Sequence, residues 1–65
     1  MTADDKKLLD KVMEVAGANE NRIHDGIVVT LRGTHDRARR SYLWRKLEKA
    51  AIAKIRRRAR TRAAA

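Results

Sequence analysis

The 65-residue chain contains no cysteine, which excludes disulfide bonds and cysteine-based zinc sites. A domain of this size buries only a modest part of its surface and commonly needs a supplement to its core. With disulfides excluded, self-association or folding on a partner remains as that supplement. The lack of cysteine also fits a reducing compartment.

Long apolar segments are missing as well. No run of bulky apolar residues is longer than Ile27–Val29, whereas a membrane-spanning helix needs about 20 apolar residues. The N-terminal segment has acidic residues early and no apolar core of a signal peptide, so no secretory leader is expected. The sequence therefore predicts a soluble intracellular protein, cytoplasmic or nucleoid-associated, with no membrane partner.

Acidic residues are scarce in the second half of the chain. Residues 1–33 carry five basic and six acidic side chains, whereas residues 34–65 carry twelve basic and two acidic ones. The net charge of the whole chain is +9. Such an asymmetry is typical of proteins whose partner is a nucleic acid or an anionic membrane.

The N-terminal segment, residues 2–17, has the pattern of an amphipathic helix. Thr2 is the expected N-cap, with Asp5 in a capping-box position, and Gly17 is the expected stop. One face of this helix is apolar, with Met13 at its edge. Its members are Leu8, Leu9, Val12, Val15 and Ala16.

The middle of the chain predicts a β-hairpin. Asp25 and Gly26 stand between β-forming residues, and a type I′ turn requires positive φ at both of its central positions. Arg22–His24 would pair with Ile27–Val29, and the second strand would continue to Leu31. A two-stranded hairpin is not stable alone, so a second copy of the chain is expected to cover its open edges.

No glycine or proline interrupts residues 34–62, and good helix formers dominate this segment. We expect one long helix, capped by Thr34 and starting no later than Ser41. At about 1.5 Å per residue it would be roughly 40 Å long. A core of this size cannot cover that length, so the C-terminal end is expected to project or to pack on another chain.

At about 100° per residue, this helix has an apolar side and a cationic side. The apolar side carries Leu43, Trp44, Leu47, Ala50, Ala51 and Ile55. The cationic side carries Arg39, Arg45, Lys46, Lys49, Arg56, Arg57 and Arg60, with Tyr42 among them. Like charges at i,i+4 cost an isolated helix a few tenths of a kcal/mol per pair. Phosphate relieves this repulsion, and arginine, which outnumbers lysine here, binds phosphate in a bidentate way.

Residues 55–62, IRRRARTR, place arginines around most of the helix circumference. No core can pack against such a turn, which is suited to lie between walls of phosphate. Residues 56–65 are therefore expected to form an arginine-rich helix end. The alternative is a tail that stays disordered until a partner binds, as arginine-rich segments often do.

Catalysis, metal binding and cofactor binding are not expected. Thr34, His35 and Asp36 are adjacent in sequence, so their side chains point apart, and the segment reads as a helix start. His24 and His35 have no ligand partners that the sequence can place, and His24 is expected to be exposed. Trp44 is expected in the core, whereas Tyr42 is a candidate for a contact with a nucleic-acid backbone or base.

Together these patterns predict a single domain, residues 1–65, with an α+β fold of α-β-β-α order and a long basic C-terminal helix, assembled as a homodimer. The expected function is nucleic-acid binding, with duplex DNA narrowly ahead of RNA, in a transcriptional regulator or architectural protein. The expected contacts are Arg37, Arg39, Arg40, Tyr42, Arg45, Lys46, Lys49, Arg56, Arg57, Arg58 and Arg60. The alternative is a protein-binding module or inhibitor that docks its amphipathic helix on an acidic partner protein.

Overall fold

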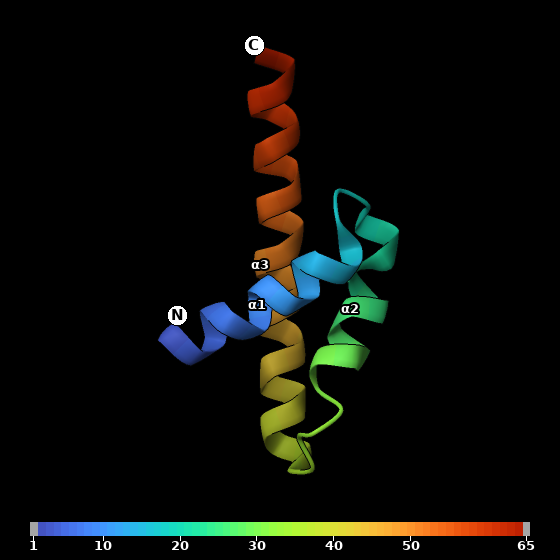
Figure 1. Ribbon diagram of the computed structural model, residues 1–65. Coiled ribbons are helices and arrows are strands. Elements are labelled where there is room, and N and C mark those ends of the chain that lie inside the picture. Colours follow the sequence, from blue (N-terminus) through green and yellow to red (C-terminus); the bar gives the residue numbers. More distant parts are fainter. Residues whose placement is uncertain (1, 65) are drawn as a thin grey trace.

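A computed structural model of the chain describes residues 2–64, with side chains described as far as Arg62. This part of the chain forms three α-helices and one short 3-10 helix (Figure 1). They are α1 (Ala3–Ala16), η1 (Glu20–Arg22), α2 (Ile23–Thr30) and α3 (Arg37–Ala64). Since residues 2–64 contain no β-strand, the protein is all-α and the predicted α+β fold is wrong.

The predicted N-terminal helix is confirmed, together with both of its ends. The Oγ1 atom of Thr2 accepts a hydrogen bond from the backbone N–H of Asp5 at 3.1 Å. At the other end Gly17 has a φ of 60°, and its N–H donates to the Met13 carbonyl at 2.8 Å. A side chain at Gly17 would be strained by this positive φ, which explains the glycine.

The prediction of a β-hairpin in the middle of the chain is wrong, because this segment forms helix α2. The buried side chains recur every four positions, at Ile23 and Ile27 within α2 and at Leu31 directly after it, which places them on one side of a helix. Gly26 is not a turn residue, because a Cβ atom built there would lie 2.7 Å from the Val12 carbonyl oxygen. The glycine instead lets the backbones of α1 and α2 approach closely. This contact explains why tertiary packing overrides the turn preference of the Asp-Gly pair.

The long C-terminal helix is confirmed, with a corrected start. Asp36, not Thr34, caps α3, because its Oδ1 atom accepts hydrogen bonds from the N–H groups of Ala38 at 2.9 Å and Arg39 at 3.2 Å. The helix then runs without interruption to Ala64. Its predicted apolar side is buried at four positions, which are Leu43, Leu47, Ala51 and Ile55.

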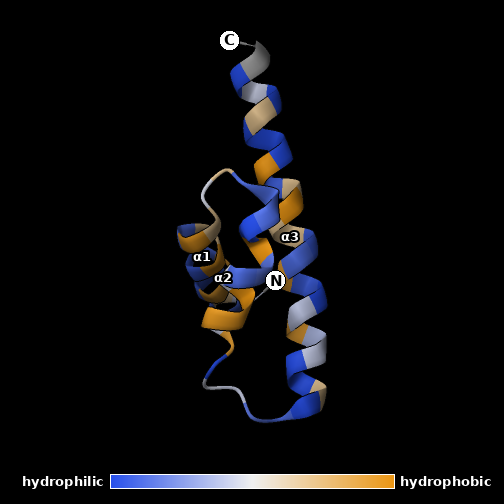
Figure 2. Cartoon of the chain, turned by 90° about the vertical axis from the view of Figure 1, so that its right-hand side faces the viewer, coloured by the Kyte–Doolittle hydropathy of each residue, from blue (hydrophilic) through white to orange (hydrophobic). Residues whose placement is uncertain are grey.

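The three helices close a core within one chain. In Figure 1 α1 crosses the middle of α3, and α2 lies beside α3. Hydrophobic residues of α3 concentrate where α1 and α2 pack against it, while both of its ends are mainly hydrophilic (Figure 2). The C-terminal part of α3 extends beyond the other helices, and the molecule measures 42 × 22 × 15 Å. Among the residues described, no helix combines the length and apolar character that crossing a bilayer requires.

Candidate nucleic-acid interface

The side of α3 turned away from the core is cationic, and we call it the cationic face. Its members lie opposite the buried stripe in helical phase, and all of them are exposed. They are Tyr42, Arg45, Lys46, Lys49, Arg56 and Arg60. No acidic residue of α3 shares this face, because the only acid within the helix, Glu48, lies toward α2. The side chains of α3 itself therefore carry one sign of charge on this face over roughly 22 Å of helix, although Glu20 of η1 pairs with Arg56.

Tyr42 lies among the cations, as the sequence predicted, and is 53% exposed. The Nζ atom of Lys46 lies 5.0 Å from the centroid of the Tyr42 ring, which is a cation–π distance. Hydrogen bonding and charge interaction with the Tyr42 side chain raise the pKa of Lys46 above its ordinary value. The raised pKa favours the charged form of Lys46.

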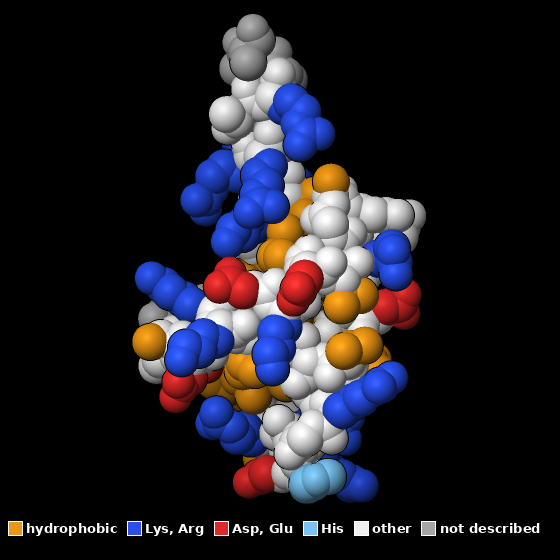
Figure 3. All heavy atoms as spheres, in the orientation of Figure 1, with side chains coloured by type: hydrophobic (Ala, Val, Ile, Leu, Met, Phe, Trp, Pro, Cys, Tyr) orange, Lys and Arg blue, Asp and Glu red, His pale blue; other side chains and the backbone are white. Residues whose placement is uncertain are grey.

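The arginine-rich end surrounds α3 with positive charge. Arg56, Arg57, Arg58 and Arg60 are all exposed, and Lys and Arg side chains gather around the C-terminal part of the helix (Figure 3). Arg57 lies at the margin of the cationic face, whereas Arg58 lies above the core side, three residues beyond Ile55. This end thus offers charge in several directions rather than along one line.

One of these arginines already has an acidic partner. The Nε atom of Arg56 donates to Oε1 of Glu20, in η1, at 2.8 Å, and both side chains are well exposed. Exposed pairs of this kind contribute about 0–1 kcal/mol, so a phosphate can displace the carboxylate. The sequence analysis missed this pair because Glu20 precedes Arg56 by 36 positions. Only the position of η1 against α3 brings them together.

The arginines at the start of α3 occupy a different side of the helix. Arg37 and Arg40 lie in line with the buried stripe, before its first member, while Arg39 lies near the margin of the cationic face. Because α2 ends at Thr30, no helix covers this first part of α3. An open hollow of about 560 Å³ remains there. Its lining residues are His35, Arg37, Arg40, Ser41, Trp44 and Arg45.

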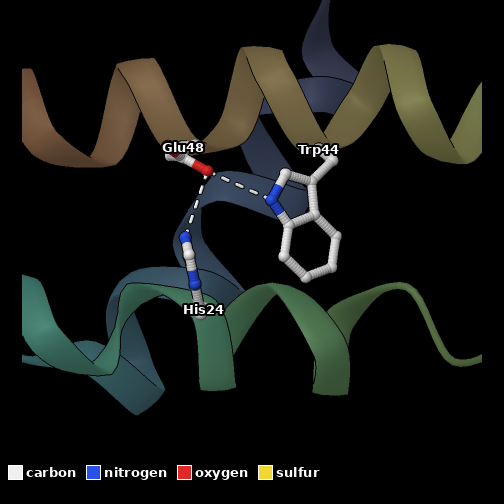
Figure 4. Close-up of polar contacts among 3 residues, drawn as sticks. All are labelled: His24, Trp44 and Glu48. Carbon is white, nitrogen blue, oxygen red and sulfur yellow. Dashed lines mark hydrogen bonds and ion pairs between the residues drawn. The ribbon is translucent and has the colours of Figure 1, made fainter.

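A polar cluster that the sequence analysis missed fixes Trp44 beside this hollow. The indole Nε1–H donates to Oε2 of Glu48 at 3.1 Å, and the same oxygen lies 3.2 Å from Nε2 of His24 (Figure 4). The His24 and Trp44 rings are 5.6 Å apart and tilted by 59°. Trp44 is half-buried against the core, near its predicted place, and His24 is exposed as expected. The i,i+4 spacing of Trp44 and Glu48 was a visible signal, but the position of His24 required α2 to be a helix.

The residues considered for catalysis or metal binding are accounted for by the fold. Asp36 is committed to the cap of α3, and His35 is an exposed residue at the rim of the hollow. Within the described part of the chain, no three His, Asp or Glu side chains lie close enough together to hold a metal ion. That the protein is not an enzyme stays a prediction.

Comparisons with protein-family models, curated proteins and solved structures find no match to this chain. Its function must therefore be inferred from the charge, exposure and geometry of α3.

Proposed function

We propose that the protein binds nucleic acid, duplex DNA in preference to RNA, through phosphate contacts along α3. The observation that supports this proposal is the exposed cationic face, on which no acidic residue of the helix lies. Double-stranded DNA carries about one negative charge per 1.7 Å of its axis. A straight cationic face of roughly 22 Å matches such a regular line of charge. Arginine adds bidentate phosphate recognition to simple attraction.

The projecting end of α3 suits a DNA groove. An α-helix with its side chains is about 10–12 Å across, and the DNA major groove is about 12 Å wide. Arginines on several sides of the helix would then reach phosphates on both walls. The major groove of duplex RNA is too narrow and deep for such an entry, which favours DNA. Since the end extends beyond α1 and α2 (Figure 1), those helices do not block the approach.

The alternative, a module that docks the apolar side of its amphipathic helix on another protein, has less support. That side consists of Leu43, Leu47, Ala51 and Ile55, which are 0–7% exposed because they form the core. On α3 a protein partner would meet exposed cations and Tyr42 rather than an apolar stripe. The fully exposed charge favours a polyphosphate over a partner that binds by apolar contact.

The homodimer expected from the sequence stays part of the proposal, with a different reason. Its first basis was an open hairpin edge, and residues 2–64 contain no strand. The remaining basis is α2, where Val28 and Val29 are 46% and 45% exposed. A dimer would also double the charge available to DNA, as suits a transcriptional regulator or an architectural protein. Sedimentation at twice the chain mass of 7.4 kDa is the expected result, and a monomer at every concentration would remove the dimer from the proposal.

The binding proposal is tested by fluorescence anisotropy with labelled duplex DNA and structured RNA at several salt concentrations. Phosphate contacts predict a log–log slope of about −0.9 per contact on duplex DNA. DNA should bind more tightly than RNA at each concentration. If neither binds at low salt, the proposed function is wrong.

A further inference from the structure

The hollow at the start of α3 has the composition of a small binding site rather than of a general cationic surface. Three arginines, Arg37, Arg40 and Arg45, line it together with His35, Ser41 and Trp44. None of the described lining residues is acidic. Its volume of about 560 Å³ lies within the range of ligand pockets in proteins, about 300–1,000 Å³.

The positive charge of the hollow comes from side chains and not from the helix end itself. The N–H groups of Ala38, Arg39 and Arg40 are already taken, because Oδ1 of Asp36 accepts from the first two and its backbone carbonyl accepts from the third. The lining residues Arg37, Arg40, Ser41, Trp44 and Arg45 follow steps of three and one along the helix, which places them on adjoining rows of one side. Three arginines and a serine therefore lie together on the first turns of α3, which none of the other described helices covers.

Trp44 supplies a fixed aromatic surface within this charged hollow. Its N–H is occupied by Glu48, and Glu48 is held in turn by His24 (Figure 4). What the ring can offer a ligand is therefore its carbon surface, not a hydrogen bond. Aromatic side chains of this kind stack on nucleobases, and each stacked base contributes about 1–3 kcal/mol in single-strand binding proteins.

We infer that the hollow binds one unpaired nucleotide of a nucleic-acid strand, with its phosphate on Arg37, Arg40 and Arg45 and its base against Trp44. This inference rests on the proposed function and adds a second mode of contact to it. A base inside a duplex is paired and stacked on both sides, so it cannot lie against the indole. Because the hollow is open to solvent, the strand can continue from it in both directions. The rest of the strand would follow the cationic face toward Arg60.

The chain contains a single tryptophan, so fluorescence excited selectively at tryptophan reports on Trp44 alone. The titrants are a single-stranded oligothymidylate, a blunt duplex of equal length and thymidine monophosphate. Anisotropy of a labelled strand measures the binding of the first two, and competition with that strand measures the binding of the monophosphate. The oligothymidylate should quench and shift the emission of Trp44, whereas the duplex should bind without changing it. Arg40→Ala should weaken single-strand binding about fourfold at 0.15 M salt, as expected for one lost contact at a single-strand slope of about −0.7 per phosphate. It should change duplex binding less.

Each outcome distinguishes this inference from the function on which it rests. Binding of strand and duplex with unchanged Trp44 emission overturns the nucleotide site and leaves the proposed function standing. Equal quenching by strand and duplex, or quenching that Arg40→Ala does not weaken, also overturns it. Quenching by the monophosphate as strong as by the oligomer, per nucleotide, overturns the assignment to a strand in favour of a free nucleotide. No binding of strand or duplex by anisotropy overturns both proposals.

Discussion

The arginine-rich end offers the sharpest test of phosphate binding, through replacement of Arg56, Arg57 and Arg58 together by alanine. All three side chains are exposed, so none supports the core, and alanine favours helix. Only the Arg56–Glu20 ion pair is lost, at a cost of about 0–1 kcal/mol. The variant should therefore remain folded, and circular dichroism and thermal unfolding check this.

The expected loss of DNA affinity follows from counterion release. Each phosphate contact adds about 0.9 to the log–log salt slope, which amounts to about 0.7 log units of affinity at 0.15 M salt relative to 1 M. Arg57 and Arg58 should each lose a full contact, whereas Arg56 is already shared with Glu20. The affinity should thus fall ~30-fold for two contacts and ~170-fold for three, and the slope should flatten by about 1.8 to 2.7.

The matched control removes three lysines of α1, Lys6, Lys7 and Lys11, by substitution with alanine. These side chains are also exposed, so the control lowers the net charge by the same amount. Anisotropy with labelled duplex DNA across a salt series should give the control the slope of the unmodified protein. If the triple arginine variant matches the control, the effect is one of net charge and the reasoning from the projecting end is refuted. Loss of folding in the arginine variant would instead make the triplet structural.

Three further predictions concern packing and charge. Gly26→Ala should lower stability by about 1–3 kcal/mol in thermal unfolding, because its Cβ would lie 2.7 Å from a backbone oxygen of α1. Gly33→Ala, with nothing within 4 Å, should change stability by no more than about 0.5 kcal/mol, and equal effects would contradict the close helix contact. Leu47→Asp should unfold the chain, since this 0% exposed position would hold a charge, and a native circular dichroism spectrum would refute its place in the core. Glu20→Gln should tighten DNA binding about two- to threefold by releasing Arg56, and an unchanged dissociation constant would place that arginine away from phosphate.

The outer helices could be predicted because their signals are local. The cap at Thr2, the stop at Gly17 and the four-residue spacing from Leu43 to Ile55 each depend on neighbours in the sequence. Helix α2 could not be predicted in the same way, because the Asp-Gly pair favours a turn. Only the approach of α1, which excludes a side chain at Gly26, decides otherwise. The same four-residue spacing exists at Ile23, Ile27 and Leu31, but the alternation of Ile27, Val29 and Leu31 fits a strand equally well.

The candidate site could also be predicted only in part. The exposed positions of the basic residues followed from helical phase, since that phase depends only on α3. The hollow did not, because it exists where α2 stops short of the first turns of α3. The ion pair of Glu20 and the shared oxygen of Glu48 each join two elements whose relative placement the sequence does not reveal.

Helix α3 carries most of the basic side chains of this very small domain and also four of the eleven buried hydrophobic residues in its described part. A ligand that holds this helix therefore also holds the folded state, and each occupied site draws the folding equilibrium toward the native chain. At a ligand concentration a hundred times the dissociation constant, this linkage is worth about 2.7 kcal/mol. Because the domain has so small a core, its lifetime in the cell would depend as much on how often the ligand is bound as on the packing of the core.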